Sequence, residues 1–398
     1  MTTTVLISGA GIAGPALAYW LRRHGFTPTV VERAAAPRTG GYKIDLRGAA
    51  VEVAERMGIL ETVRENEAGM RTMSFVDATG RRVAELPSDL FMGRGAEDVE
   101  IMRGKLAQIL VDATGDVEYL LGDAITALVE TDAGVEVTFE HAPARTFDLA
   151  VGADGLHSRV RALAFGAEEQ YLHDLGHGVA IYRVPNHLGL DREELLYSTV
   201  GRTVSAYSEA GSTDAAAMFL FPAPDGLPAD RRAFLTETFT GAGWETDRLL
   251  AGADAAPDFY ADSVSQVRME SWSRGRVALV GDAAYCPSLA SGQGTSLALV
   301  GAYVLAGELA AAGGDHAAAF AAYEQRMRAF VEVNQKLGSD GIKRMVPTSK
   351  LQVRLGMVVM RLLPKLPGRE RLVEKMTGPI HDAATAIDLP VYSVAGCL

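Results

Sequence analysis

Cysteine is scarce in this sequence. The 398 residues include only Cys286 and Cys397, so the chain cannot form the set of disulfide bonds that stabilises many small secreted domains. Two free thiols suit a reducing compartment, and we expect a cytoplasmic protein. Histidine is also sparse, with eight residues. His173 and His177 have a spacing that suits a metal, but no third ligand lies nearby in the sequence, so no metal site is expected.

Clusters of positive charge and long hydrophobic runs are lacking as well. A net charge of −12 without a basic cluster argues against nucleic-acid binding. The apolar stretch Leu355–Leu363 contains Arg361 and is too short to cross a bilayer. The N-terminus leads into an apolar run without a charged segment or cleavage site, so we expect no signal peptide and no membrane partner. Repeats and low-complexity segments are also missing.

The composition that is present is that of an ordinary globular protein. Hydrophobic residues make up 48% of the chain and charged residues 22%. The length suggests two or three domains with a large core.

The strongest motif lies at the start of the chain. A short β-branched run, Val5–Ile7, is followed by Gly9, Gly11 and Gly14, then by apolar residues at helical intervals. A second apolar run ends at Glu32. This order predicts a strand, a tight turn, a helix and a strand, the unit that places a pyrophosphate at a helix N-terminus. The alternative for the glycines alone is an ordinary turn.

Glu32 narrows the choice of nucleotide. It follows Gly14 by 18 residues, where a carboxylate can accept hydrogen bonds from ribose hydroxyls. The same carboxylate would repel an adenosine 2'-phosphate. We therefore expect the tightly bound nucleotide to be FAD or NAD rather than NADP.

Charged residues follow this unit. In one interpretation Asp45 and Arg47 face a cofactor ring, while Arg38 contacts a second, anionic nucleotide; in the other they belong to a solvated loop. Arg103 begins the predicted helix of Glu100–Thr114 and can bind a phosphate or the polar arm of a cofactor. The alternative for Arg103 is a surface arginine.

Two buried strands later in the chain each end in glycine and aspartate. The first leads into Asp154-Gly155, and the second, Val277–Val280, leads into Gly281-Asp282. Gly292-Gln293-Gly294 then opens a long alanine-rich helix whose N-terminal N–H groups can stabilise negative charge. Between the first unit and Asp154, residues 117–141 predict an antiparallel excursion of three strands.

The middle of the chain has a different pattern, with many short strand-like runs. Residues 72–86 predict a hairpin, and strand-like runs separated by Gly, Pro and Asp continue from 173 to 269, with a helix at 231–239. This pattern indicates a second domain on an antiparallel sheet, inserted into the first. We therefore predict an α/β protein with a Rossmann-like nucleotide-binding domain in two parts, 1–172 and 263–345. Residues 173–262 would form the inserted substrate domain, and 346–398 a C-terminal helical segment.

The helix expected at 347–363 should close the gap between the two domains. A peripheral membrane helix is the alternative for this segment. Met, Val and Leu at helical spacing are more often core residues, which favours the first interpretation.

These motifs together resemble the class A flavin-dependent aromatic hydroxylases, including the tetracycline-inactivating and aromatic polyketide monooxygenases. The resemblance spans nearly the whole chain and implies noncovalent FAD. It implies these FAD-binding residues: Gly9, Gly11, Ala13, Gly14, Glu32, Arg33, Asp45, Arg103, Asp154, Asp282, Gly292, Gly294 and Thr295. It also implies that Arg38 and Asp154 contact NAD(P)H. The sequence departs from the family at Tyr285, where histidine is usual, at Ser296, where asparagine is usual, and at Gly301, where aspartate is common.

The resemblance also implies the reaction. NAD(P)H reduces FAD and leaves, dioxygen adds to give a flavin C4a-hydroperoxide, and the hydroperoxide hydroxylates an aromatic or polyketide-like small molecule. No nucleophile or triad is expected, and Arg47, near the flavin ring and substrate, is the one candidate catalytic residue. The expected substrate contacts are Arg183, Tyr207, Phe219 and Leu289, and a monomer is expected.

Two other functions fit the same residues. One is an FAD-dependent NAD(P)H dehydrogenase or reductase that inserts no oxygen. The other is a non-catalytic protein that binds FAD or a polyketide.

Overall fold

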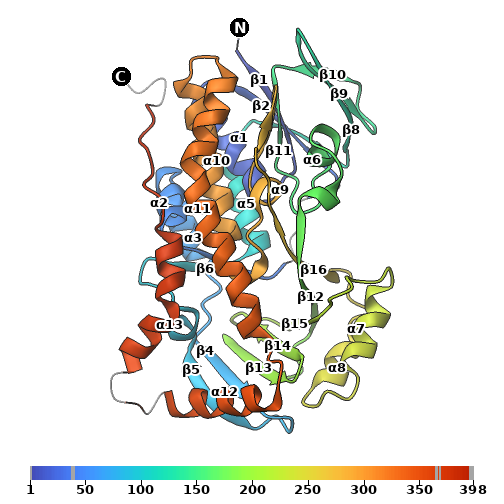
Figure 1. The fold of residues 1–398 in the computed structure, drawn as a ribbon, viewed down its shortest axis with the longest axis vertical. Helices are drawn as coiled ribbons and strands as arrows, with labels where there is room; N and C mark the ends of the chain where they lie inside the picture. Colours follow the sequence, from blue (N-terminus) through green and yellow to red (C-terminus); the bar gives the residue numbers. More distant parts are fainter. Residues whose placement is uncertain (1, 37–40, 364–365, 367–368, 394–398) are drawn as a thin grey trace.

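The computed structural model describes residues 2–36, 41–363, 366 and 369–393. Arg38 and Cys397, both discussed above, lie outside these ranges. The described chain is long in one direction, with one sheet in its upper part and a second sheet in its lower part (Figure 1).

The upper sheet has six strands in the order β17-β18-β11-β1-β2-β7. Neighbouring strands from β18 to β7 run parallel, and β17 is an antiparallel edge. The bounds are β1 Thr4–Ser8, β2 Thr27–Glu32, β7 Glu118–Leu121, β11 Leu149–Gly152, β17 Ser273–Arg274 and β18 Val277–Leu279. The first two strands flank α1, Ala13–Arg23, as the glycine-rich motif predicts.

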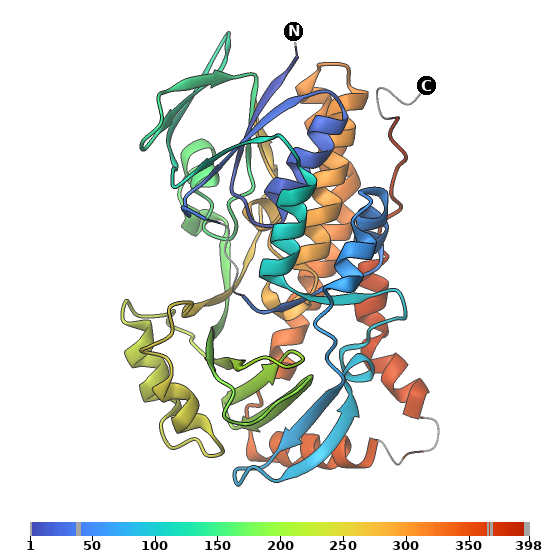
Figure 2. The same ribbon diagram turned by 180° about the vertical axis from the view of Figure 1, so that it is seen from behind.

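Helices pack against one face of this sheet. Helix α1 packs against α10, Gly294–Ala311, and α10 also contacts α2, Ala49–Arg56, and α11, His316–Met345. On the other side lies a small sheet of β8, Ile125–Thr131, β9, Gly134–Phe139, and β10, Arg145–Phe147, as the two opposite views show (Figures 1 and 2). Their apolar side chains form one continuous core.

The predicted excursion between residues 117 and 141 is only partly antiparallel. β8 and β9 pair antiparallel, but β7 pairs parallel with β2 and completes the upper sheet. A short strand of four residues carries no local signal for its direction, because direction depends on a partner 90 residues earlier in the chain.

The lower sheet has seven strands in the order β16-β12-β15-β14-β13-β4-β5. The bounds are β4 Thr72–Val76, β5 Arg82–Pro87, β12 Leu172–Pro185, β13 Glu193–Thr199, β14 Arg202–Ser208, β15 Asp214–Pro222 and β16 Tyr260–Val267. The predicted hairpin is present as β4 and β5, and it joins this sheet through a parallel pairing of β4 with β13. Residues far apart in the sequence thus share one sheet.

The two faces of the lower sheet have different partners. Helices α7, Arg231–Phe239, and α8, Thr246–Ala251, cover one face with a core rich in aromatic rings. The C-terminal part of α11 packs on the opposite face through Ile342. In addition, β3, Lys43–Leu46, and β6, Val99–Met102, form a two-stranded ribbon. Short helices complete the first half of the chain: α3 Leu60–Glu65, α4 Ser88–Met92, α5 Arg103–Ala113 and α6 Arg159–Ala164.

Helix α10 is the one helix in the described residues that is long and apolar enough to cross a membrane. Its position explains this composition, since 78% of it is buried inside the protein. Apolar residues on all sides are typical of a helix enclosed by a core.

The C-terminal helices differ from the sequence prediction. A helix forms where expected, α12 at Lys350–Leu362, but its main contacts are with β5 and β13 of the lower sheet, not between the two sheets. Helix α13, Arg369–Ala384, contacts α4 and α11 instead. The prediction that the apolar residues of α12 belong to the core is wrong for five of its eight Leu, Val and Met residues, which are exposed. Met357 and Met360 pack inward, whereas Leu351 and Leu355 are exposed.

Candidate functional site

The site predicted from glycines and acids forms where the parallel strands end. Strands β1, β2, β11 and β18 are parallel neighbours, so their carboxyl ends share one edge of the sheet. The glycine-rich loop follows β1, Glu32 is the last residue of β2, and Asp154 and Asp282 follow β11 and β18. Open α/β sheets bind ligands at this edge. Residues up to 273 positions apart in the sequence thus meet at one place.

Two glycines allow the chain to pack closely here. Gly9 has a φ of +104°, and a β-carbon at this position would lie 2.6 Å from the carbonyl oxygen of Ala153. A β-carbon at Gly14 would lie 1.9 Å from the carbonyl oxygen of Gly9. Only glycine fits either position, which agrees with the packing role predicted for the third glycine.

The N-terminus of α1 faces this loop without a side-chain cap. Ile12 occupies the N-cap position and makes no side-chain hydrogen bond to the helix. The first N–H groups of a helix have no partner within the helix and attract anions. The start of α1 is therefore suited to a phosphate group.

Glu32 holds the loop in place. Its carboxylate accepts hydrogen bonds from the backbone N–H groups of Ala10, at 2.8 Å, and of Ala34, at 2.9 Å. Each carboxylate oxygen can accept a further bond, so a contact with ribose hydroxyls is compatible with this arrangement. This bracing of the loop was not predicted from the sequence, because it depends on backbone groups rather than on residue types.

Arg103 lies over the glycine-rich loop. It begins α5, its backbone N–H donates to the carbonyl of Tyr42, and one guanidinium nitrogen would lie 3.7 Å from a β-carbon at Gly11. The half-buried guanidinium makes no hydrogen bond or ion pair with any residue that the structure describes, and its carbon lies 6.0 Å from the centre of the Tyr42 ring. A partly buried cation that makes no direct ion pair within the described chain is suited to an anionic ligand.

Asp282 lies close to the start of α10. A β-carbon at Gly294 would lie 3.6 Å from one Asp282 carboxylate oxygen. Burial raises the pKa of Asp282, and the guanidinium of Arg103 acts in the opposite direction. Since the Arg103 guanidinium acts on the pKa of Asp282, the two side chains lie near each other in this site. Burial also raises the pKa of the nearby Cys286 thiol, so that this cysteine stays protonated and acts as a small buried side chain.

Two buried polar atoms at the start of α10 lack partners. Gln293 and Ser296 are fully buried, and neither the Gln293 Oε1 nor the Ser296 Oγ has a hydrogen-bond partner in the described chain. Buried polar groups are rarely left unpaired, so such atoms beside a ligand site indicate contacts that a ligand would supply. Neither residue was predicted as a site residue.

Asp154 has several partners within the protein. It accepts hydrogen bonds from the hydroxyl groups of Ser8 and Ser158 and from the N–H groups of Arg159 and Val160, at distances up to 3.4 Å. Burial raises its pKa, and these bonds act in the opposite direction. The carboxylate thus ties the start of α6 to β1.

Asp45 and Arg47 form a buried ion network. Arg47 donates to Asp45 at 2.8 Å and to the carbonyls of Met92 and Gly93, and Arg94 donates to the other Asp45 oxygen at 2.8 Å. Burial alone would raise the pKa of Asp45, but the two guanidinium groups lower it. Both terminal nitrogens of Arg47 thus have protein partners. Arg94 was not predicted from the sequence.

The remaining predicted residues border these groups. Ala13 is the first residue of α1 and would lie 3.0 Å from a β-carbon at Gly281, and Gly292 adopts the left-handed conformation that ends a short 3-10 helix, Leu289–Ser291. Thr295 lies in the first turn of α10, and Arg33 directly follows β2.

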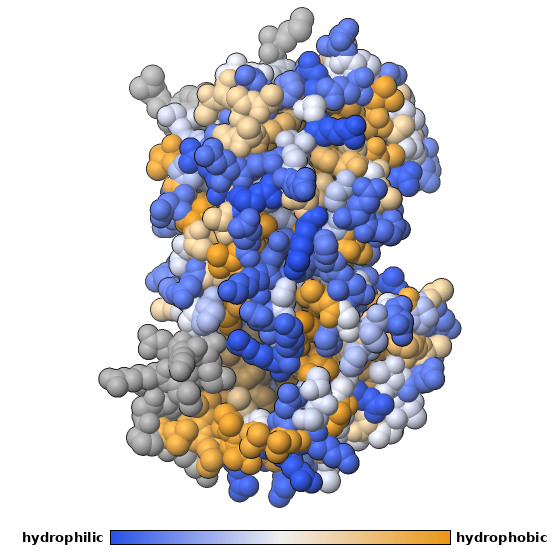
Figure 3. Space-filling view, in the orientation of Figure 1, coloured by the Kyte–Doolittle hydropathy of each residue, from blue (hydrophilic) through white to orange (hydrophobic). Residues whose placement is uncertain are grey.

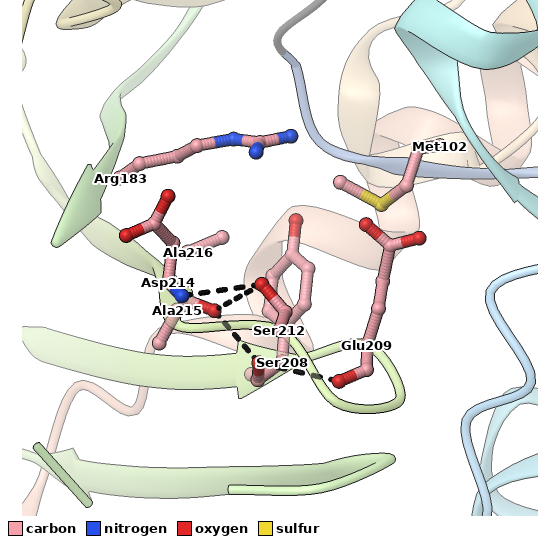
Figure 4. A pocket seen from close by; sticks show the side chains of 9 residues that line it. Met102, Arg183, Ser208, Glu209, Ser212, Asp214, Ala215 and Ala216 are labelled. Atoms are coloured by element: carbon pink, nitrogen blue, oxygen red, sulfur yellow. Dashed lines mark hydrogen bonds between the residues drawn. The ribbon is translucent and has the colours of Figure 1, made fainter. Parts of the chain in front are cut away.

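Two of the four predicted substrate residues line a common pocket. Arg183 and Tyr207 line a small, partly open pocket of about 10 Å³ together with Met102, which directly precedes Arg103 (Figure 4). The Arg183 side chain reaches across this pocket, and the buried Tyr207 hydroxyl accepts a hydrogen bond from the backbone N–H of Lys43 at 3.1 Å. Burial raises the pKa of Tyr207, so the phenol keeps its proton at neutral pH.

Phe219 and Leu289 lie elsewhere. Phe219 is fully buried against the rings of Tyr182 and Phe239, on the face of the lower sheet covered by α7 and α8. This position does not suit a substrate contact. Its neighbour Leu220 points to the opposite face, toward α11, because side chains alternate along a strand. Leu289 is 37% exposed in the loop before α10.

These residues fit FAD. The uncapped start of α1 and the guanidinium of Arg103 suit a pyrophosphate, Glu32 suits a ribose, and the unpartnered atoms at the start of α10 suit a polar ring edge. The parallel sheet and this loop define a dinucleotide-binding protein.

Comparison with known proteins identifies the family. Residues 2–336 match the family described as FAD binding domain. A flavin-dependent monooxygenase from an unknown prokaryotic organism is 44% identical over 342 residues, 85% of this chain and 89% of that protein. The crystal structure of tetracycline destructase Tet(55) is 40% identical, with a TM-score of 0.85 over 98% of this chain and 99% of that one. For Tet(51) the identity is 36% and the TM-score 0.86, over 98% and 100%.

The chain therefore belongs to the FAD-binding-domain family and is an FAD-dependent monooxygenase of the aromatic hydroxylase type. The resemblance inferred from the sequence is confirmed.

Proposed function

We propose that this protein uses NAD(P)H and dioxygen to hydroxylate an aromatic, polyketide-like small molecule. The observation that carries the proposal is the guanidinium of Arg103, which has no hydrogen-bond or ion-pair partner among the described residues and lies over the glycine-rich loop, beside the uncapped start of α1. An anionic dinucleotide completes this arrangement. The similarity to two tetracycline destructases supports a polycyclic substrate of this kind.

Each part of the site has a defined task. The N–H groups of the glycine-rich loop and α1, with Arg103, bind the pyrophosphate; Glu32 binds the ribose and Asp282 the ribityl chain. When bound and reduced by NAD(P)H, FAD supplies the electrons that activate dioxygen for transfer to the substrate. The N-terminus of α10 provides N–H groups that stabilise negative charge on the ring.

The substrate lies between the lower sheet and this site. Tyr207 and Arg183 line the pocket next to Met102 and orient the substrate, and Leu289 contributes an apolar contact. The Tyr207 hydroxyl accepts from Lys43, so its own proton is free to be donated to a substrate oxygen.

NAD(P)H binds transiently in this proposal, because the chain has a single glycine-rich dinucleotide motif. Arg38 contacts the phosphates of NAD(P)H. Asp154 also contributes to the NAD(P)H site, because its hydrogen bonds hold the segment between β11 and α6 in place. Replacing Arg38 with alanine should slow anaerobic flavin reduction without lowering FAD content. An unchanged reduction rate at all NAD(P)H concentrations would remove Arg38 from this role.

The decisive experiment is a substrate screen with the purified, FAD-loaded enzyme. Tetracyclines and other aromatic polyketides are added with NADPH or NADH, and both NAD(P)H oxidation and the mass of the product are measured. A substrate that stimulates NAD(P)H oxidation and gains one oxygen atom supports the proposal. Oxidation of NAD(P)H without oxygen gain would indicate the dehydrogenase alternative, and flavin that NAD(P)H never bleaches would indicate a binding protein.

A further inference from the structure

Helix α12 leaves one apolar face uncovered. Leu351, Leu355, Val358 and Leu362 follow one another at intervals of four, three and four residues, which places them on one face of the helix. The first three are 65%, 55% and 52% exposed. With Val359 and Leu366, this segment supplies six of the large exposed apolar side chains of the described residues. We call the four residues on this one face, Leu351, Leu355, Val358 and Leu362, the α12 stripe.

The stripe is not the face by which α12 is attached to the protein. Met357 and Met360 point toward the hairpin β4–β5 and pack there with Phe75 and Leu86. Helix α12 is thus apolar on two faces, one in the core and one in solvent. Apolar side chains gather over α12 at the lower end of the molecule (Figure 3), and the helix lies across that end (Figure 1). Contiguous exposed apolar patches mark interaction sites.

The charge of this segment is opposite to that of the whole chain. Between residues 341 and 363 there are five cationic side chains and no acidic one, although the net charge of the protein is −12. The cations are Lys343, Arg344, Lys350, Arg354 and Arg361. At 100° per residue, the three on α12 share a strip of the helix surface beside the α12 stripe.

We propose that the α12 stripe binds the surface of an anionic lipid bilayer. Apolar side chains flanked by lysine and arginine are what an interfacial helix needs, because the apolar face enters the headgroup boundary while the cations contact lipid phosphates. From the sequence we expected no membrane partner and preferred a core helix at 347–363 to a peripheral membrane helix. The exposed α12 stripe favours that alternative. The proposal is independent of the reaction and of the FAD site.

A second copy of the chain fits this surface less well. In a twofold dimer each surface patch meets its own copy, so Lys350, Arg354 and Arg361 of one protomer would face the same cations of the other. Like charges placed opposite each other across an interface are unfavourable. An anionic bilayer satisfies both the apolar and the cationic side chains.

The test is sedimentation of the FAD-loaded protein with lipid vesicles. One vesicle preparation is phosphatidylcholine alone, and the other contains about one third phosphatidylglycerol, whose negative charge attracts basic segments. We expect the protein to sediment with the anionic vesicles, less so at high salt, and at least tenfold more weakly after L355E/V358E. The matched control is V129E, because Val129 is an equally exposed apolar side chain far from α12, on β8.

Each outcome decides the proposal. Vesicle binding that is lost in L355E/V358E and kept in V129E supports it, provided that both variants retain normal flavin content. Wild-type protein that stays in solution with anionic vesicles overturns it. Binding that is equal in wild type and L355E/V358E also overturns it. If light scattering instead shows a dimer that L355E/V358E abolishes, with no vesicle binding, the partner is a second copy and the lipid proposal is wrong.

Discussion

Arg103 has no ion-pair partner among the described residues, so we expect it to contribute strongly to the affinity for FAD. Replacing it with alanine removes a charge-assisted contact worth about 1.5–3 kcal/mol, so the dissociation constant for FAD should rise roughly 10- to 100-fold. Titration of flavin-free protein with FAD, followed by flavin fluorescence, measures this change. Arg248→Ala, at an exposed position on α8, should leave the affinity unchanged. Equal affinity of Arg103→Ala and wild type would contradict the assignment.

Two departures from the family are coupled in space. Tyr285 is fully buried, and a β-carbon at Gly301 would lie 1.9 Å from its hydroxyl oxygen. The tyrosine thus fills the volume that a side chain at position 301 would need. This explains why tyrosine at 285 and glycine at 301 occur together in this chain.

This coupling predicts a non-additive pair of mutations. Gly301→Ala should destabilise the protein by about 1–3 kcal/mol, because it overpacks the core. Tyr285→Phe removes the hydroxyl and its contact with the Tyr323 hydroxyl at 2.9 Å, at a cost of about 1 kcal/mol. The double variant Y285F/G301A should be more stable than the sum of the single effects. Urea denaturation of all four proteins tests this, and strict additivity would reject the coupling.

At the scale of single elements, local sequence patterns were sufficient where partners are close in the chain. The unit β1–α1–β2, the hairpin β4–β5 and helix α7 lie where they were predicted. The patterns failed where the partner is distant. The parallel pairing of β7 with β2, and that of β4 with β13, depend on strands 90 and 120 residues away, which a local pattern does not encode.

His157 joins two such elements. It lies between β11 and α6, and its ring nitrogens contact Asp262 on β16 at 2.8 Å and Glu168 at 2.9 Å. The hydrogen bond to Asp262 raises its pKa to about 9, with burial acting in the opposite direction. Since this folded-state pKa exceeds the unfolded value near 6.5, the protonated ring stabilises the fold fully below pH 6.5. The contribution is lost as the pH rises through about 9.

The replacement His157→Gln should therefore matter most at low pH. We expect a loss of about 1 kcal/mol or less below pH 6.5, because the side chain is nearly half exposed and screened by solvent, and a smaller loss above about pH 9. Urea denaturation across this range measures it. His141→Gln, at an exposed loop position, should show no such trend. A loss that grows with pH would refute the linkage.

At the scale of the whole molecule, residue types were enough to predict the nucleotide site, but not the packing of the elements around it. Glycines and acidic residues at the ends of buried strands indicate a nucleotide site, because such a site requires close backbone approach to phosphates and carboxylates that bind ribose. The bracing of the loop by Glu32, the ion network around Asp45 and the inward face of Phe219 depend on the packing of distant elements. The exposed face of α12 was missed for the same reason, since spacing alone does not show which side a neighbour covers.

Lys43, on β3, connects the two-stranded ribbon β3–β6 to the lower sheet electrostatically. Its ammonium lies 2.6 Å from Glu194 on β13 of the lower sheet and 3.2 Å from Glu100 on β6. It also lies 5.0 Å from the centre of the Tyr207 ring, which lines the pocket. Burial alone would lower the pKa of Lys43, but the two carboxylates more than offset this and hold it above its ordinary value.

Removing this cation should loosen the junction between the β3–β6 ribbon and the lower sheet. Lys43→Met leaves Glu100 and Glu194 buried without it, and breaking a buried ion pair in this way costs about 3–5 kcal/mol. Adding Glu194→Gln should recover part of the loss, because one uncompensated charge disappears. Lys105→Met, which breaks an exposed pair with Glu209 at 2.7 Å, should cost less than about 1 kcal/mol. Chemical denaturation of the FAD-loaded variants measures all three, and equal losses for Lys43→Met and Lys105→Met would show that the network does not hold the ribbon to the lower sheet.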